Sequence, residues 1–150
     1  MWTPDVYQGA PSIITTLLST LPKIAAFGVL IRLLVYPFGE IIVDWGKILI
    51  ILSISSMLIG SLGALRQTDL KRLMAYSTIN HIGFILMGLI PGSEDGITSI
   101  CIYLIFYTTM NLGIFLFILN MQRDQVSVTS IKDLSGLYRS QPLTAGCISI

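Results

Sequence analysis

The sequence predicts an all-α membrane protein: a polytopic helix bundle with four full transmembrane helices and the start of a fifth. Hydrophobic residues make up 53% of the 150 residues and charged residues only 11%, whereas soluble domains carry about 25% charged residues. The few charges are clustered, and the runs between them approach the roughly 20 apolar residues that cross a bilayer. Because lipid offers the backbone no hydrogen bonds, such runs are expected to be helices.

The predicted spans follow one another within a single transmembrane domain, separated by short polar connections. They cover about 13–36, 47–65, 73–90 and 97–120, and a fifth apolar segment opens at about 142. Residues 1–12 contain several breakers and the amphipathic rings of Trp2 and Tyr7, so they predict a turn-rich loop at the membrane interface.

Basic residues distinguish the two sides of this domain. Arg32 and Lys47 lie near one side, at span ends where long side chains can reach the interface. Six of the nine Lys and Arg residues lie in two connections on the other side: Arg66, Lys71, Arg72, Arg123, Lys132 and Arg139. The positive-inside rule places that second side, with the N-terminal loop, in the cytoplasm or mitochondrial matrix.

Lys23 lies at the centre of the first span, where a cation costs at least about 2.5–3.5 kcal/mol. Its helical face is polar, because residues at i, i+3, i+4 and i+7 are Thr16, Ser19, Thr20 and Lys23. Pro22 withholds an N–H from the helix and allows a kink beside the lysine. No predicted span contains a carboxylate, so the counter-charge lies outside this chain or the lysine is partly neutral. In both cases Lys23 can exchange a proton, and we expect it to be functional.

The third and fourth spans also carry polar stripes. His81 is mid-span on a face with Ser77 and Asn80, and it is interpreted either as a neutral histidine satisfied between helices or as a proton relay. The fourth span carries an uncharged stripe, for which interhelical hydrogen bonding is favoured over a water path: Tyr107, Thr108 and Asn111.

The second span presents a row of small residues, Ser56, Gly60 and Ala64, which predicts close helix packing. Cys101 and Cys147 both fall in apolar stretches without metal-ligand spacing, and we expect them to be thiols buried in the membrane. Phosphate loops, zinc spacings and paired in-span histidines are missing from the sequence, and there is no basic stripe for nucleic acid. We therefore expect no metal, no redox centre and no nucleic-acid partner.

Two blocks of this sequence resemble a known family. MWTPDVYQGAP followed by LPKIAAFGVLIRLL, and QTDLKRLMAYSTINHIGFIL at 67–86, are similar to the antiporter-like proton-translocating subunits of NADH:quinone oxidoreductase, respiratory complex I. The first block looks most like the subunit N branch, called NADH dehydrogenase subunit 2 in mitochondria. The second block is shared with multisubunit cation/proton antiporters.

The resemblance implies a role in proton translocation coupled to NADH:ubiquinone electron transfer. Lys23 matches one of the buried lysines that pass protons, and His81 matches a histidine of the second block. The family subunit is far longer, so the chain would be a central fragment. A further lysine and its partner glutamate would precede Met1, and another lysine would follow Ile150.

The resemblance also implies partners and a location. The chain would be a subunit of a proton-translocating reductase with no redox catalysis of its own, because NADH, quinone, flavin and iron–sulfur clusters belong to other subunits. Its partners would be other complex I membrane subunits, an adjacent antiporter-like subunit, a second fragment of the same subunit, and the lipid bilayer. The mitochondrial inner membrane is the expected location, with a bacterial plasma membrane as the alternative. Two other functions stay open: a sodium/proton antiporter subunit, and a scaffold that transports nothing.

Overall fold

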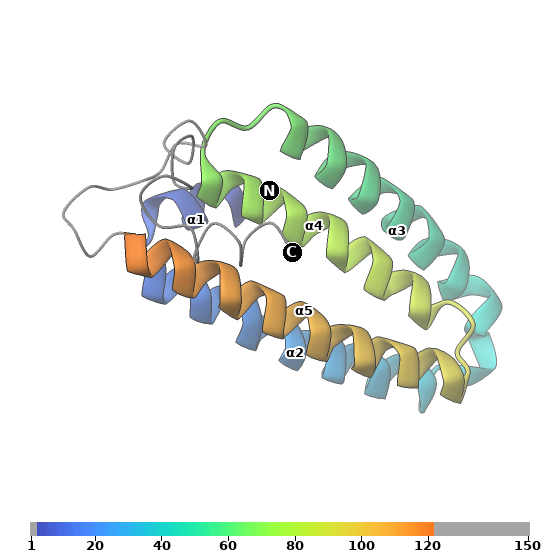
Figure 1. Cartoon of the computed structure of the whole chain (residues 1–150). Helices are drawn as coiled ribbons and strands as arrows, with labels where there is room; N and C mark the ends of the chain where they lie inside the picture. Colours follow the sequence, from blue (N-terminus) through green and yellow to red (C-terminus); the bar gives the residue numbers. More distant parts are fainter. Residues whose placement is uncertain (1–2, 122–150) are drawn as a thin grey trace.

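Helices account for almost all of the computed structural model, which describes residues 3–121 (Figure 1). The elements in chain order are α1 (Thr3–Gly9), α2 (Ser12–Val35), η1 (Gly39–Ile41), α3 (Ile42–Leu65), α4 (Leu70–Leu89) and α5 (Glu94–Met121). No strand occurs within residues 3–121. The predicted all-α class is therefore confirmed, whereas the predicted fifth segment from 142 lies outside the described residues.

Three stretches of the described chain are long and apolar enough to cross a membrane: Ser12–Val35, Gly39–Leu65 and Glu94–Leu119. The count of four predicted spans is not confirmed, because α4 is not among them. α4 has 20 residues, about 30 Å at 1.5 Å per residue. Its length is therefore close to that of a span, but Lys71 and Arg72 in its first turn make it more polar than the three candidate spans. Ser77, Asn80 and His81 add to this polarity.

Two helix starts differ from the expectation. The N-terminal residues were predicted to form a loop, yet Thr3–Gly9 form helix α1. Pro4 is compatible with this helix because it lies in the first turn, where a missing N–H costs nothing. The second long helix begins at Ile42 rather than near 47, and Asp44 in its first turn suits the positive end of the helix dipole.

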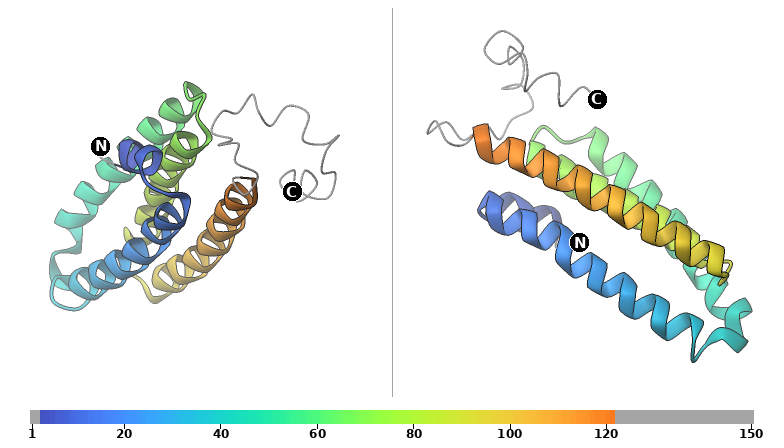
Figure 2. Two further views of the ribbon diagram at one scale, coloured as in Figure 1. Left: turned by 90° about the vertical axis from the view of Figure 1, so that its left-hand side faces the viewer. Right: turned by 60° about the horizontal axis from the view of Figure 1, so that its bottom comes forward.

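α4 occupies the middle of the arrangement. It packs against α1, α3 and α5, while α2 lies alongside α5 (Figures 1 and 2). Two apolar clusters fill the interior at opposite ends. One contains Phe27, Trp45, Leu49, Ile85, Leu89, Ile100 and Leu104. The other, next to α1, contains Tyr7, Met74, Ala75, Phe115 and Ile118.

α3 and α4 approach each other very closely. A Cβ added at Gly60 would lie 2.6 Å from the backbone nitrogen of Asn80, so only glycine fits there. Ser56 Oγ donates a hydrogen bond to Ile79 O at 2.6 Å, and Ser53 Oγ donates to Gly83 O at 2.7 Å. Close packing at Ser56 and Gly60 is thus confirmed.

Cys101 is free and is not covered by the other described helices, because it is exposed on α5. It lies within the candidate span Glu94–Leu119, so its burial within the membrane stays a prediction. Cys147 lies outside the described residues.

Candidate functional site

The amine of Lys23 lies at the point where α1, α2 and α5 meet. Its Nζ donates hydrogen bonds to Ser19 O at 2.7 Å, to the Tyr107 hydroxyl at 2.8 Å and to the Tyr7 hydroxyl at 3.1 Å. An ammonium group has three N–H donors and no acceptor. All three donors of a protonated Lys23 therefore have partners, and every partner is neutral.

The rest of the polar face of α2 is buried but satisfied by its own helix. Thr16 Oγ1 donates to Ser12 O at 2.7 Å. Ser19 Oγ and Thr20 Oγ1 donate to Thr16 O at 2.7 and 3.1 Å. These hydroxyls give Lys23 a polar surrounding without competing for its amine. α2 runs continuously through Pro22, which is exposed.

Tyr107 connects the lysine to α4. Its hydroxyl lies 3.0 Å from Thr78 Oγ1, and either oxygen can be the donor. Tyr107 and Thr78 are both buried. A continuous set of hydrogen bonds therefore joins Lys23 on α2, Tyr107 on α5 and Thr78 on α4.

His81 lies next to this set, half-buried on α4. Its Nδ1 is 2.8 Å from the hydroxyl of Tyr103, and its ring centroid is 5.4 Å from that of Tyr107. Which partner donates depends on the tautomer. Lys23 and His81 thus contact tyrosines one turn apart on α5, and no hydrogen bond joins the two residues directly among those that the structure describes.

Two other predicted polar residues lie elsewhere. Ser77 and Asn80 line a groove between α3 and α4 together with Gly60 and Gln67, so the structure does not bring them to Lys23. Asn111 is buried on α5 one turn after Tyr107, and its side chain interacts with that tyrosine. Its Nδ2 has no hydrogen-bond partner among the described residues.

A cavity of about 460 Å³ adjoins the lysine between α1, α2 and α4. Its polar lining comes from four side chains: Thr3, Tyr7, Lys23 and Thr78. The remaining lining is apolar and includes Phe27 and Ile82. The volume could hold several water molecules, each of which occupies about 30 Å³ in the liquid, and the four polar groups offer them partners at the Lys23 end.

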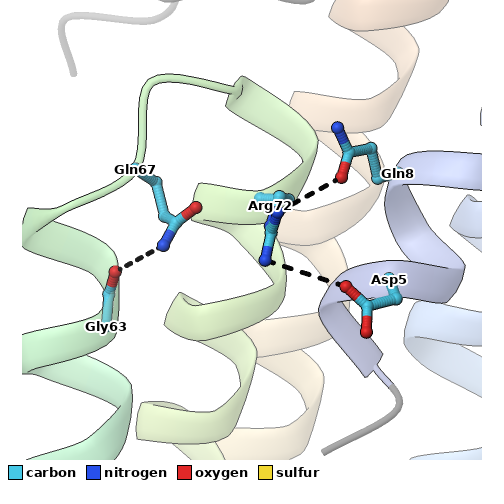
Figure 3. Close-up of polar contacts among 5 residues, drawn as sticks. All are labelled: Asp5, Gln8, Gly63, Gln67 and Arg72. Carbon is cyan, nitrogen blue, oxygen red and sulfur yellow. Dashed lines mark hydrogen bonds and ion pairs between the residues drawn. The ribbon is translucent and has the colours of Figure 1, made fainter.

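α1 is held against the start of α4. Lys71 Nζ donates to Ala10 O at 3.2 Å, and Arg72 lies 3.7 Å from an Asp5 carboxylate oxygen and 3.5 Å from the Gln8 side-chain oxygen (Figure 3). Burial lowers the pKa of the Lys71 amine, which precedes the predicted span, and Asp69 opposes this shift. Burial raises the pKa of the Tyr7 phenol on α1, so this hydroxyl stays neutral at physiological pH.

Sequence reasoning missed several members of the site. Tyr7 was assigned to an interfacial loop, and Thr78 and Tyr103 were not singled out. Tyr107 was expected to form interhelical hydrogen bonds, and it does. The signal that could have found Thr78 is its position three residues before His81, which places both on one face of α4.

Membrane-length helices that enclose a mid-helix lysine among neutral hydroxyls define a helical membrane domain with an ionisable centre. The chain belongs to the NADH:quinone oxidoreductase/Mrp antiporter transmembrane family, whose model matches residues 1–150.

Bacterial proteins named NADH-quinone oxidoreductase subunit N are similar to this chain. The relative from Gluconacetobacter diazotrophicus is 47% identical over 150 residues, which are 100% of this chain and 32% of the relative. The relative from Jannaschia sp. is 46% identical over 150 residues, 100% of this chain and 31% of the relative. The relative from Parvibaculum lavamentivorans is 44% identical over 145 residues, 97% of this chain and 30% of the relative. The chain therefore spans about a third of the length of these relatives.

Proposed function

We propose that this chain is part of an N-type membrane subunit of a complex I-type NADH:quinone oxidoreductase, and that Lys23 accepts and releases a proton during translocation. The observation that carries the proposal is the surrounding of Lys23. Its amine is bonded to Ser19 O and to two phenol hydroxyls, and no carboxylate pairs with it in the part of the chain that the structure describes. Neutral partners leave the charge of the ammonium uncompensated, which favours a group that gains and loses its proton.

His81 is proposed to relay protons beside Lys23. Its ring lies beside that of Tyr107, which accepts from Lys23, and it can carry a proton on either ring nitrogen. Pro22 lines the cavity next to Lys23, and its missing N–H gives α2 local freedom there. The buried hydroxyls of α2 serve as the polar surface along which the proton approaches.

Two alternatives use the same fold. The family description covers both oxidoreductase and antiporter proteins, so a sodium/proton antiporter subunit has the same helices. The relatives named subunit N favour the oxidoreductase. A scaffold that transports nothing finds support in the close α3–α4 contact at Gly60, but it gives no reason for a lysine at the centre of α2.

We propose a location in a bacterial plasma membrane, supported by the same relatives. These are bacterial, which supports a plasma membrane and leaves the mitochondrial inner membrane, our first expectation, without support. We propose that α4 crosses the membrane as a fourth span over about 73–90, because the helix is close to bilayer length and both flanking helices are candidate spans. The N-terminal end then faces the cytoplasm by the positive-inside rule. Other complex I membrane subunits are the proposed partners, and we propose that the redox cofactors belong to other subunits of the complex.

The test replaces Lys23 by Met in the full-length subunit of the assembled complex. Proton pumping and NADH oxidation are measured in proteoliposomes, with and without sodium. We expect Lys23→Met to abolish pumping through this subunit, whereas Lys47→Met, which removes an exposed lysine of α3, leaves pumping unchanged. Normal pumping by Lys23→Met would overturn the proposal, and pumping that requires sodium would favour the antiporter.

A further inference from the structure

We propose that Lys71 is a positioning residue for Lys23: together with Arg72 it fixes α1, and α1 in turn holds the Tyr7 hydroxyl on the Lys23 amine. This inference rests on the proposed function, because it concerns how the Lys23 site is kept in place. Two basic residues in the first turn of α4 are thereby linked to the centre of α2 through a short helix.

The first step is the contact between Lys71 and the end of α1. Lys71 is only 7% exposed, and its amine donates to Ala10 O at 3.2 Å. The last carbonyls of a helix lack partners within the helix and carry partial negative charge. Lys71 thus supplies a donor and a positive charge at the end of α1 where both are favourable. A buried amine without such a partner would be costly.

The second step is the contact of Arg72 with the solvent side of α1. Its guanidinium lies 3.7 Å from an Asp5 carboxylate oxygen and 3.5 Å from the Gln8 side-chain oxygen (Figure 3). The Asp5 side chain is 77% exposed, and exposed ion pairs contribute little. Arg72 therefore orients α1, while the buried Lys71 contributes more to holding it.

The third step is that α1 cannot keep its position alone. It has seven residues, and isolated helices of fewer than about 12 residues are marginal in water. Its packing partners are mainly on α4, with fewer on α2. Loss of the Lys71 contact is therefore expected to displace α1 as a unit, and the Tyr7 hydroxyl with it.

The fourth step is the effect on Lys23. Tyr7 is buried, its ring meets Phe115 edge-on at a centroid distance of 6.2 Å, and its hydroxyl accepts one of the three Lys23 N–H groups. Three titratable groups face Lys23 from the helices around it: Tyr7 on α1, His81 on α4 and Tyr107 on α5. Tyr103 on α5 contacts His81. None of the three tyrosines carries charge at neutral pH, so each ammonium hydrogen bond matters for holding the proton.

The experiment measures the pH dependence of proton pumping in the assembled complex with the full-length subunit. Tyr7→Phe keeps the ring packing and removes the acceptor, and Lys71→Met removes the donor to Ala10 O. We expect each to move the alkaline limb of the profile to lower pH by about one unit. The double variant should shift no further than Tyr7→Phe alone, because both changes remove the same hydrogen bond.

Two controls keep the result specific. Lys71→Arg restores a cationic donor and should return the profile towards wild type. Arg66→Gln removes an exposed cation from the connection just before α4 and should leave the profile unchanged. If Lys71→Met does not assemble, Arg72→Gln replaces it, with a smaller shift in the same direction that disappears in the Tyr7→Phe background.

Three results would overturn the inference: a wild-type profile for Tyr7→Phe, a wild-type profile for Lys71→Met, or additive shifts in the double variant. Where Arg72→Gln is used in place of Lys71→Met, the same criteria apply to Arg72→Gln. Lys23→Met separates this failure from that of the proposed function. If Lys23→Met pumps normally, the proposed function fails. If it does not pump while the other profiles disagree with the expectation, only the positioning role of Lys71 fails.

Discussion

Lys23 Nζ lies 2.8 Å from the hydroxyl of Tyr107, although 84 residues separate them in sequence. The same hydroxyl is 3.0 Å from Thr78 Oγ1, so one phenol connects three helices. Tyr107→Phe removes an acceptor from Lys23 and leaves the buried Thr78 without this partner. Because hydrogen bonds to charged groups contribute about 1.5–3 kcal/mol, we expect proton pumping at neutral pH to fall about tenfold or more. Tyr36→Phe, at an exposed tyrosine, is the matched control. Full pumping by Tyr107→Phe would show that Lys23 does not depend on this bond.

His81 offers a prediction that separates a relay from a structural histidine. A positioned proton-transfer group contributes about 10²–10⁴-fold to rate, so His81→Leu should lower pumping by at least about tenfold while the complex still assembles. Tyr103→Phe removes only the partner of Nδ1 and should have a smaller effect. Pumping is measured per NADH oxidised. If His81→Leu lowers the amount of assembled complex but not the pumping of what assembles, His81 is the satisfied interhelical histidine of the alternative interpretation.

Gly60 predicts a packing effect that is independent of proton transfer. An alanine Cβ there would lie 2.6 Å from Asn80 N and 2.9 Å from Asn80 Cα, both backbone atoms. Overpacking of this kind costs about 1–3 kcal/mol, so Gly60→Ala should lower the thermal stability of the complex or its yield. Gly28→Ala is the control, since a Cβ at Gly28 meets nothing within 4 Å among the described residues. Equal stability of the two variants would contradict the close α3–α4 contact.

Ser53 and Ser56 should stabilise the same helix pair through their hydroxyls. Both donate to α4 carbonyls, and hydrogen bonds between membrane helices contribute about 0.6 kcal/mol each on average. The double variant Ser53→Ala/Ser56→Ala is therefore expected to lose about 1 kcal/mol of unfolding free energy in detergent. Ser55→Ala should lose nothing, because Ser55 Oγ donates to Ile51 O of its own helix. An equal loss in the control would assign the effect to helix propensity.

The sequence predicted the long helices well because their signal is local. Uninterrupted apolar runs can be recognised without knowing which helices pack against them. α2, for example, runs from Ser12 to Val35, where a span was predicted over 13–36. α1 was missed because two prolines and one glycine, Pro4, Gly9 and Pro11, lie within or next to it. Its contact with Lys71 also joins residues that are 61 positions apart, because Lys71 Nζ donates to Ala10 O.

Helical periodicity predicted which residues share a face, but not which neighbour that face meets. Ser77, Asn80 and His81 are close on the helix, yet the first two line the α3–α4 groove while His81 contacts Tyr103 on α5. Ser77 and Asn80 therefore face α3, whereas His81 faces α5. Thr108 shows the same limit, because its hydroxyl donates to Leu104 O of its own helix rather than across an interface.

The two hydrogen bonds of Tyr107 have a consequence for how charge is communicated. A phenol has a single proton, so it cannot donate to Lys23 and to Thr78 at the same time. While Lys23 is an ammonium it offers no acceptor, and the Tyr107 proton is free to point to Thr78. Once Lys23 is neutral, its lone pair can take that proton in a hydrogen bond, and Thr78 loses it. Rotation of the Tyr107 hydroxyl therefore couples the charge of Lys23 on α2 to the hydrogen bonding of Thr78 on α4, without movement of either helix.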